Sequence, residues 1–147
     1  MRKSSARAGG RPDRGAATVE FALISIPLLA LVFGAISYGY MLSFRQAMSQ
    51  GAAEGARAAA VWAASYDSTQ DTARIAAAKA SIDEALASYG VSCSSGATCT
   101  VTITPCGSAR CVRVTVSYPY ADDPLTPDPF LIPLPETLTY VADARVS

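Results

Sequence analysis

An uncharged apolar run from Phe21 to Phe44 is the feature that most constrains what this chain can fold into. At a rise of about 1.5 Å per residue, a helix of about 24 residues crosses a hydrocarbon core of about 30 Å with some tilt. A helix in the core of a soluble domain rarely stays uncharged for so long. The sequence therefore predicts a single transmembrane helix near the start of a chain of 147 residues.

Basic side chains precede this run and predict its orientation. Residues 1–15 hold one acid, Asp13, against the basic residues Arg2, Lys3, Arg7, Arg11 and Arg14. Short flanks rich in Lys and Arg stay in the cytoplasm, so we expect the N-terminus inside and the C-terminal part outside. The remainder of the chain is net acidic and repels phosphate, which argues against a nucleic-acid-binding surface.

A cleavable secretory signal also combines a basic start with an apolar core. Its core is typically about 7 to 15 residues long and ends in a small-residue cleavage site. The present run is longer and ends in SYGYMLSF. We therefore expect no signal peptidase cleavage after the apolar core.

The cysteine count of four is even, and all four cysteines follow the apolar run: Cys93, Cys99, Cys106 and Cys111. In a small domain exported to an oxidising compartment, such cysteines form disulfides. A bond from Cys106 to Cys111 would clamp the end of a hairpin and leave Cys93 to pair with Cys99, although cross-pairing remains open. A zinc site is the weaker alternative, because the spacing lacks a CxxC pair and the chain has no histidine.

Helical patterns continue beyond the apolar run. Pro27 predicts a kink within the membrane helix, because proline removes a backbone donor and clashes with the preceding turn. Residues 45–65 are alanine-rich and carry small residues at helical spacing: Gly51, Ala52, Gly55, Ala59 and Ala63. This small face either packs on the chain's own domain or contacts a neighbouring subunit, and the sequence leaves both open.

A second helix is predicted from Ser68 to Gly90, with a capping-box variant at its start. Its apolar stripe consists of Ile75, Ala78, Ile82, Leu86 and Tyr89, with Asp71, Arg74, Asp83 and Glu84 mostly off that line. Alternation with a period of two then predicts strands around 99–104, 112–116 and 138–146. The proline-rich segment 118–135 predicts an irregular surface excursion. The expected fold is α+β, with a kinked membrane helix, an amphipathic helix and a small antiparallel sheet of about three strands.

Motifs that carry chemistry are scarce. The sequence has no histidine, no Gly-rich phosphate loop and no nucleophile elbow. We therefore expect no enzyme activity, no cofactor and no bound metal.

A lone acid, Glu20, opens the apolar run. An ionised carboxylate at the centre of a membrane helix costs about 2.5 to 3.5 kcal/mol, and somewhat less near the edge. A cut between Gly15 and Ala16 would create an α-amine that pairs with Glu20 of a neighbouring subunit. The alternative is that Glu20 extends to water and marks only the cytoplasmic boundary. The residues alone leave both open.

The basic stretch that ends in Gly15, followed by Ala16, Glu20 and Phe21, resembles the class III prepilin signal of the type IV pilin superfamily. The segments RGAATVEFALISIPLLALVFGAI and GAAEGARAAA are similar in particular to the TadE-like proteins, which are minor pilins or pseudopilins of the tight-adherence (Flp) pilus system. The similarity is strong over roughly residues 14–62 and weak elsewhere.

This resemblance implies a pilin-like organisation: a cleaved leader at 1–15, an assembly helix at 16–44 and an exported domain at 45–147. It implies that an inner-membrane prepilin peptidase cuts after Gly15, and that Glu20 aligns subunits during assembly. The expected partners are this peptidase, other pilins and pseudopilins, and the inner-membrane assembly platform. The expected location is the bacterial cytoplasmic membrane and, after processing, a pilus that serves adhesion.

Two other functions remain in view. One is a signal-anchored binding domain that never polymerises and uses its hairpin and proline-rich loop to bind a ligand. The other is a type II secretion pseudopilin, although these usually begin with Phe after the cut, where this chain has Ala16.

Overall fold

The computed structural model describes residues 13–62, 68–125 and 135–146. Within these ranges the chain forms an α+β fold with one long helix and a three-stranded antiparallel sheet, as the sequence predicts. The helices are α1 (Asp13–Ala60) and α2 (Asp71–Leu86), with short 3-10 turns at Ser68–Gln70 and Ala87–Tyr89 on either side of α2. The strands are β1 (Thr98–Cys106), β2 (Ala109–Tyr118) and β3 (Leu138–Arg145).

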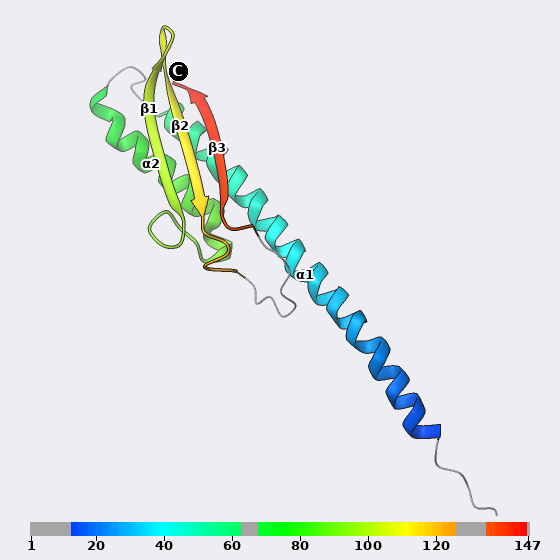
Figure 1. The fold of residues 1–147 in the computed structure, drawn as a ribbon. Coiled ribbons are helices and arrows are strands. Elements are labelled where there is room, and N and C mark those ends of the chain that lie inside the picture. Colours follow the sequence, from blue (N-terminus) through cyan, green and yellow to red (C-terminus); the bar gives the residue numbers. More distant parts are fainter. Residues whose placement is uncertain (1–12, 63–67, 126–134, 147) are drawn as a thin grey trace, which may run out of the picture.

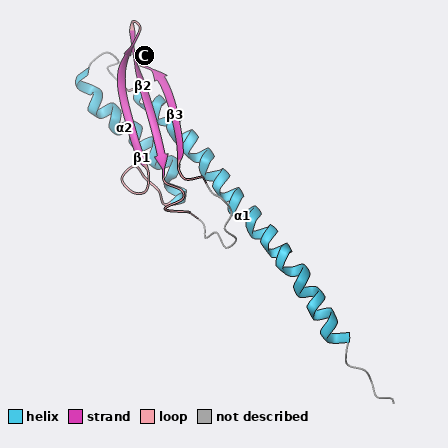
Figure 2. Ribbon diagram, in the orientation of Figure 1, coloured by secondary structure: helices cyan, strands magenta, loops and turns pink. Residues whose placement is uncertain are grey.

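The domain has two layers (Figure 1). The sheet, in the order β1-β2-β3, forms one layer, and α2 together with the C-terminal half of α1 forms the other. Figure 2 shows that the N-terminal half of α1 extends away from both layers as an isolated helix. The apolar side chains between the layers form one core.

The sheet buries one face because its side chains alternate in and out of the core. Val114 of β2 lies between Val101 of β1 and Ala142 of β3, and all three belong to the core side. The hairpin turn between β1 and β2 uses Gly107 with φ +67°, a conformation that residues with a Cβ rarely adopt. The alternation predicted for all three strands is thereby confirmed.

Small residues let α1 and α2 approach closely. A Cβ added at Gly55 would lie 2.9 Å from Ile82 Cγ1, and one added at Gly51 would lie 3.3 Å from Ala85 Cβ. Ala52 and Ala59 are also buried. The small face of the alanine-rich segment therefore packs on the chain's own domain, the first of the two alternatives, while Ala63 lies outside the described residues.

The start of α2 differs from the capping box expected at Ser68. The segment begins as a 3-10 turn, the α-helix proper starts at Asp71, and no side chain caps it. The buried face of α2 also differs from the predicted apolar stripe, because it includes Arg74, which is fully buried beside Ala78, Ile82 and Leu86. Helical spacing places Arg74 on this face, and only its charge suggested an outward position. The left-handed Gly90 ends the following 3-10 turn, close to the expected end of the helix.

The proline-rich segment is less peripheral than its composition suggests. Tyr118, the last residue of β2, and Tyr120 are both buried in the core, so the inward alternation of β2 continues two residues past its end. Segment 126–134 lies outside the described residues. The expectation of a purely surface excursion is therefore wrong for its first residues.

Pro27 lies inside α1, which continues through it as one helix of 48 residues. At about 1.5 Å per residue, this helix is about 70 Å long. The kink expected at Pro27 stays a prediction.

Candidate functional site: the exposed start of α1

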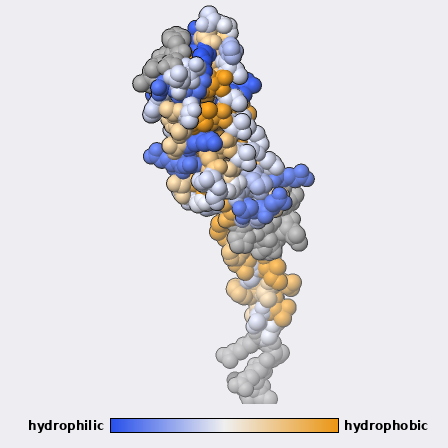
Figure 3. Space-filling model, turned by 90° about the vertical axis from the view of Figure 1, so that its left-hand side faces the viewer, coloured by the Kyte–Doolittle hydropathy of each residue, from blue (hydrophilic) through white to orange (hydrophobic). Residues whose placement is uncertain are grey.

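The N-terminal half of α1 exposes apolar side chains on all sides. Phe21, Leu31 and Ile36 keep 73%, 69% and 60% of their surfaces exposed, respectively. Figure 3 shows this hydrophobic helix projecting from a domain whose surface mixes hydrophilic and hydrophobic residues. Within the described ranges it is the only helix long and apolar enough to cross a membrane. These properties fit a single-pass membrane protein.

The residues of the expected signal lie together at the start of this helix. Gly15, Ala16, Glu20 and Phe21 are all exposed. A Cβ at Gly15 would meet nothing within 4 Å. Because α1 begins at Asp13, the bond between Gly15 and Ala16 lies in its first turn. Among the described residues, Glu20 shows no hydrogen bond or ion pair within the chain.

The domain first covers α1 at Met41 and Phe44, which are 3% and 0% exposed. The Phe44 ring meets those of Tyr89 and Tyr118 edge-on at centroid distances of 5.1 Å and 4.9 Å. Tyr120 lies 6.3 Å from the same ring. Such edge-to-face pairs are favourable, and they fix the base of the domain on the helix.

The exposed apolar segment therefore ends about one turn earlier than the apolar run in the sequence. From Phe21 to Tyr40 it is about 20 residues long, which corresponds to about 30 Å and matches a hydrocarbon core. Tyr38 and Tyr40 lie at the end of this segment that is next to the domain. Tyrosine is common at membrane interfaces, so both residues suit this position. Because the domain packs on α1 from Met41 onward, only the residues before Met41 can lie in a membrane.

The opposite end of the domain holds a charged network that the sequence did not predict. Arg74 Nη1 donates to the carbonyl oxygen of Ala59 at 2.8 Å. The carboxylate of Asp71 lies 4.0 Å from Arg74 Nε and accepts a hydrogen bond from Arg110. The sequence contained one indication of this network: Arg74 is a basic residue at a position of the helix that its spacing assigns to the apolar stripe.

Both favoured disulfides are present. Cys106 bonds to Cys111 across the hairpin turn, and Cys93 bonds to Cys99 at the start of β1. The Cys93 amide also donates to Asp83 Oδ1 at 2.6 Å, which ties the first bridge to α2. In the part of the chain that the structure describes, no group of His, Cys, Asp or Glu side chains is arranged to hold a metal ion.

One exposed ion pair lies on the outer face of the sheet. Arg113 donates from Nε and Nη2 to the two carboxylate oxygens of Asp143, at 2.8 Å and 3.0 Å. These bonds lower the pKa of Asp143 and raise that of Arg113. The two residues are direct neighbours on β2 and β3, so the pair bridges the strands.

Comparison with known protein families gives one match, and it covers the part of the chain that forms the exposed helix. The family model described as TadE-like protein matches residues 15–57. Searches of curated proteins and of solved structures gave no significant match. The matched residues comprise the exposed helix from Gly15 and most of its packed continuation in the domain, and over these residues the chain is similar to the TadE-like proteins.

Proposed function

We propose that this protein is a minor pilin or pseudopilin of a Tad pilus system, processed by a prepilin peptidase and then taken into the pilus. The TadE-like match supports involvement in such a system. The observation that carries the proposal is an apolar helix left exposed up to Met41, with Gly15, Ala16 and Glu20 near its N-terminal end.

An exposed apolar helix suits both of the environments that such a subunit occupies. In the membrane, lipid covers the apolar side chains, and every backbone hydrogen bond is satisfied within the helix. In a fibre, the helices of neighbouring subunits would cover the same surface. Because the described part of the domain leaves most of this segment exposed and meets it at Tyr40, whose ring packs on Tyr89, the subunit can exchange lipid for protein neighbours without refolding.

The position of Gly15 in the first turn also suits proteolysis. The first amides of a helix have no intrahelical acceptor, so the terminal turn opens at little cost. Opening would expose the bond between Gly15 and Ala16 to the peptidase while the rest of α1 stays helical. The cut would leave a new α-amine at Ala16, one helical turn before Glu20.

The proposal assigns no catalytic role to the domain. Its contribution is to fix α1 at one end and to display the sheet outside the membrane. We propose the peptidase, other pilins and pseudopilins, and the assembly platform in the cytoplasmic membrane as partners, with the N-terminus in the cytoplasm. Adhesion would then be a property of the assembled pilus.

The test is co-expression of the full chain with a prepilin peptidase, followed by N-terminal sequencing. We expect a chain shortened by about 15 residues that begins at Ala16, as the leader length predicts. Gly15→Leu should keep the full length. Gly39→Leu is the matched control, because a Cβ at Gly39 also meets nothing within 4 Å, and it should be processed normally.

An intact leader on the unmodified chain would contradict the proposal. A processed chain that never co-purifies with pilus components would point instead to a signal-anchored binding domain. Co-purification with components of a type II secretion system would assign it to the other pseudopilin class.

A further inference from the structure

We propose that the hollow between α1 and β3 at Arg45 binds the phosphate group of a membrane phospholipid. Leu42, Arg45, Gln46, Ser49 and Tyr140 line this surface hollow, whose volume is about 450 Å³. The proposal rests on insertion of α1 in a membrane. It is independent of proteolytic processing and of pilus assembly.

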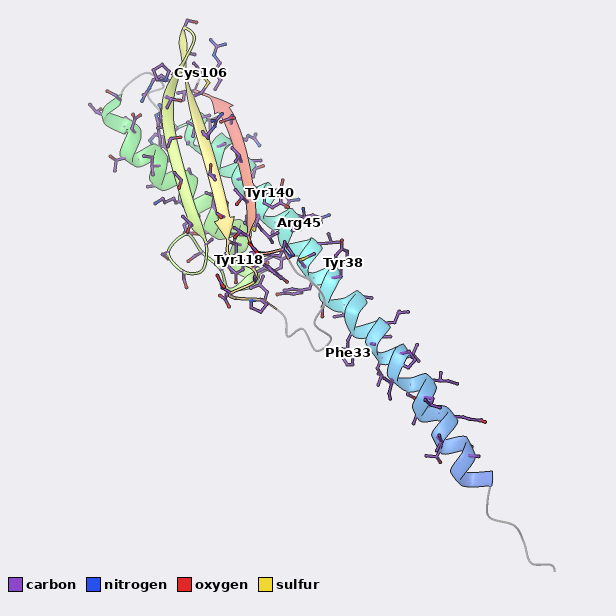
Figure 4. The ribbon with its side chains drawn as sticks, in the orientation of Figure 1. Phe33, Tyr38, Arg45, Cys106, Tyr118 and Tyr140 are labelled. Atoms are coloured by element: carbon purple, nitrogen blue, oxygen red, sulfur yellow. A yellow bond between two sulfur atoms is a disulfide. The ribbon has the colours of Figure 1, made fainter. Side chains whose placement is uncertain are left out.

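Arg45 occupies the level at which lipid phosphates lie. The exposed apolar segment ends at Tyr40, and Arg45 is the first charged residue after it. Five residues of helix place Arg45 about 7 to 8 Å beyond Tyr40, which is within the headgroup region when Tyr38 and Tyr40 occupy the interface. Figure 4 shows Arg45 beyond Tyr38 along α1, with Phe33 further toward the N-terminus.

The guanidinium of Arg45 is already oriented. Its Nε donates to the Tyr140 hydroxyl at 2.8 Å, so β3 holds the side chain in place. Figure 4 shows these two side chains next to each other, at the point where the sheet meets α1. Among the described residues, the terminal nitrogens of Arg45 make no ion pair. They are the donors that a phosphate oxygen requires.

The other residues of the hollow fit the same ligand. Among the residues that the structure describes, Arg45 is the only charged one that lines the hollow, and its charge is positive. The Ser49 hydroxyl and the Gln46 amide add donors on the same face of α1, one turn apart. Leu42 precedes Arg45 by about one turn of α1, toward the exposed apolar segment, where an acyl chain would begin. Guanidinium and phosphate form charge-assisted hydrogen bonds in a bidentate geometry.

A bound phosphate would link the exported domain to the membrane surface. The contact involves α1 through Arg45 and the sheet through Tyr140, so it would fix the domain relative to the bilayer. It would also have to break when the subunit leaves the membrane. Lipid binding at Arg45 would therefore favour retention of the subunit in the bilayer.

Native mass spectrometry of the full chain in a phosphate-free detergent tests the proposal. The protein is titrated with phosphatidylglycerol, with diacylglycerol, which has the same acyl chains but no phosphate, and with inorganic phosphate alone. We expect phosphatidylglycerol to bind more tightly than the other two. Arg45→Gln should weaken its binding about tenfold, the equivalent of one charge-assisted hydrogen bond.

Arg57→Gln is the matched control, since Arg57 is also an exposed arginine of α1 but lies about 18 Å further from the membrane. Its lipid binding should equal that of the unmodified chain. Tyr140→Phe should weaken phospholipid binding less than Arg45→Gln, because the guanidinium remains but is no longer oriented.

Equal loss in the Arg45 and Arg57 variants would overturn the proposal, as would unchanged binding in Arg45→Gln. Inorganic phosphate that binds as tightly as the phospholipid would also overturn it, because the site would then bind a free anion. Circular dichroism of each variant checks that the fold is retained, which the exposed position of both arginines predicts.

Discussion

Arg74 donates a hydrogen bond from Nη1 to the carbonyl oxygen of Ala59 at 2.8 Å, so that a guanidinium with no exposed surface closes the end of α1. Carbonyl groups in the last turn of a helix lack an intrahelical partner, and a cation there also interacts favourably with the helix dipole. Asp71 lies between Arg74 and Arg110. The same contacts therefore join α1, α2 and β2 at the end of the domain farthest from the exposed helix.

Arg74→Leu should lower the free energy of unfolding by about 2 to 4 kcal/mol, because it leaves a buried carbonyl unsatisfied and removes a cation beside Asp71. Arg74→Lys should recover only part of this loss, since an ammonium group cannot reproduce the planar donor geometry of guanidinium. Urea unfolding of the full chain in detergent micelles provides the measurement. Lys79→Leu, at an exposed position of α2, is the control and should change stability little.

Gly55→Ala tests the close contact between the helices. The added Cβ would lie 2.9 Å from Ile82 Cγ1 and 3.1 Å from the Ala78 carbonyl oxygen, and that backbone atom cannot move away easily. We expect a loss of about 1 to 3 kcal/mol in unfolding free energy. Gly39→Ala should be neutral or slightly stabilising, because its Cβ meets nothing within 4 Å and alanine favours helix. Equal stability of the two variants would show that the helices are not in contact at Gly55.

The sequence predicted the parts of this fold that depend on periodicity. The apolar run, the helical stripe of α2 and the alternation of the three strands each follow from a local pattern, and the hairpin brings Cys106 close to Cys111. The exposed positions of Gly15 and Glu20 likewise follow from their place at the start of the run. Local pattern thus suffices wherever a residue's role is set by its neighbours in the chain.

The contacts that the sequence did not reveal are long-range. Arg74 is buried because the end of α1 supplies an acceptor, the carbonyl oxygen of Ala59. The hydrogen bond from Arg45 to Tyr140 joins residues separated by most of the chain. The sequence places Tyr120 in a surface loop, whereas the structure packs its ring near that of Phe44 in the core. In each case the partner, rather than the residue, determines the environment.

Tyr118 predicts a stability change at alkaline pH. Burial raises the pKa of its phenol to about 12, and the side chain and negative charge of the neighbouring Asp123 add to this effect. The phenol also donates a hydrogen bond to the Asp123 carbonyl oxygen. The folded state thus favours the neutral phenol. The resulting stabilisation is complete below about pH 10, the pKa of an unfolded tyrosine, and is lost as the pH rises through about 12.

We therefore expect the unfolding free energy of the unmodified chain to fall more steeply between about pH 10 and pH 12 than that of Tyr118→Phe. At neutral pH, Tyr118→Phe should cost about 1 kcal/mol for the lost hydrogen bond. Tyrosinate absorbance of the unmodified chain should include a late-ionising phenol that is lost in Tyr118→Phe. The control Tyr38→Phe, at an exposed tyrosine, should retain the late ionisation.

Each disulfide closes a short loop and should contribute about 2 kcal/mol by restricting the unfolded chain. Replacing Cys106 and Cys111 together by alanine, or Cys93 and Cys99 together, should lower stability by about this amount under oxidising conditions. Non-reducing peptide mapping should find only these two pairings in the unmodified chain. A chain with free thiols or with cross-paired cysteines would contradict the structure.

Glu20→Gln isolates the role of the carboxylate at the start of α1. The amide keeps the size of the side chain and removes its charge, so membrane insertion should become easier and cleavage after Gly15 should continue. If Glu20 pairs with the Ala16 amine of a neighbouring subunit, the variant should be processed but absent from purified pili.

Glu54→Gln is the control. Glu54 is an exposed acid of the same helix that lies within the domain, so this variant should be incorporated normally. Immunoblotting of sheared pili and of membranes gives, for each variant, the ratio of subunit in pili to subunit in the membrane. Normal incorporation of Glu20→Gln would show that Glu20 marks only the boundary of the membrane segment.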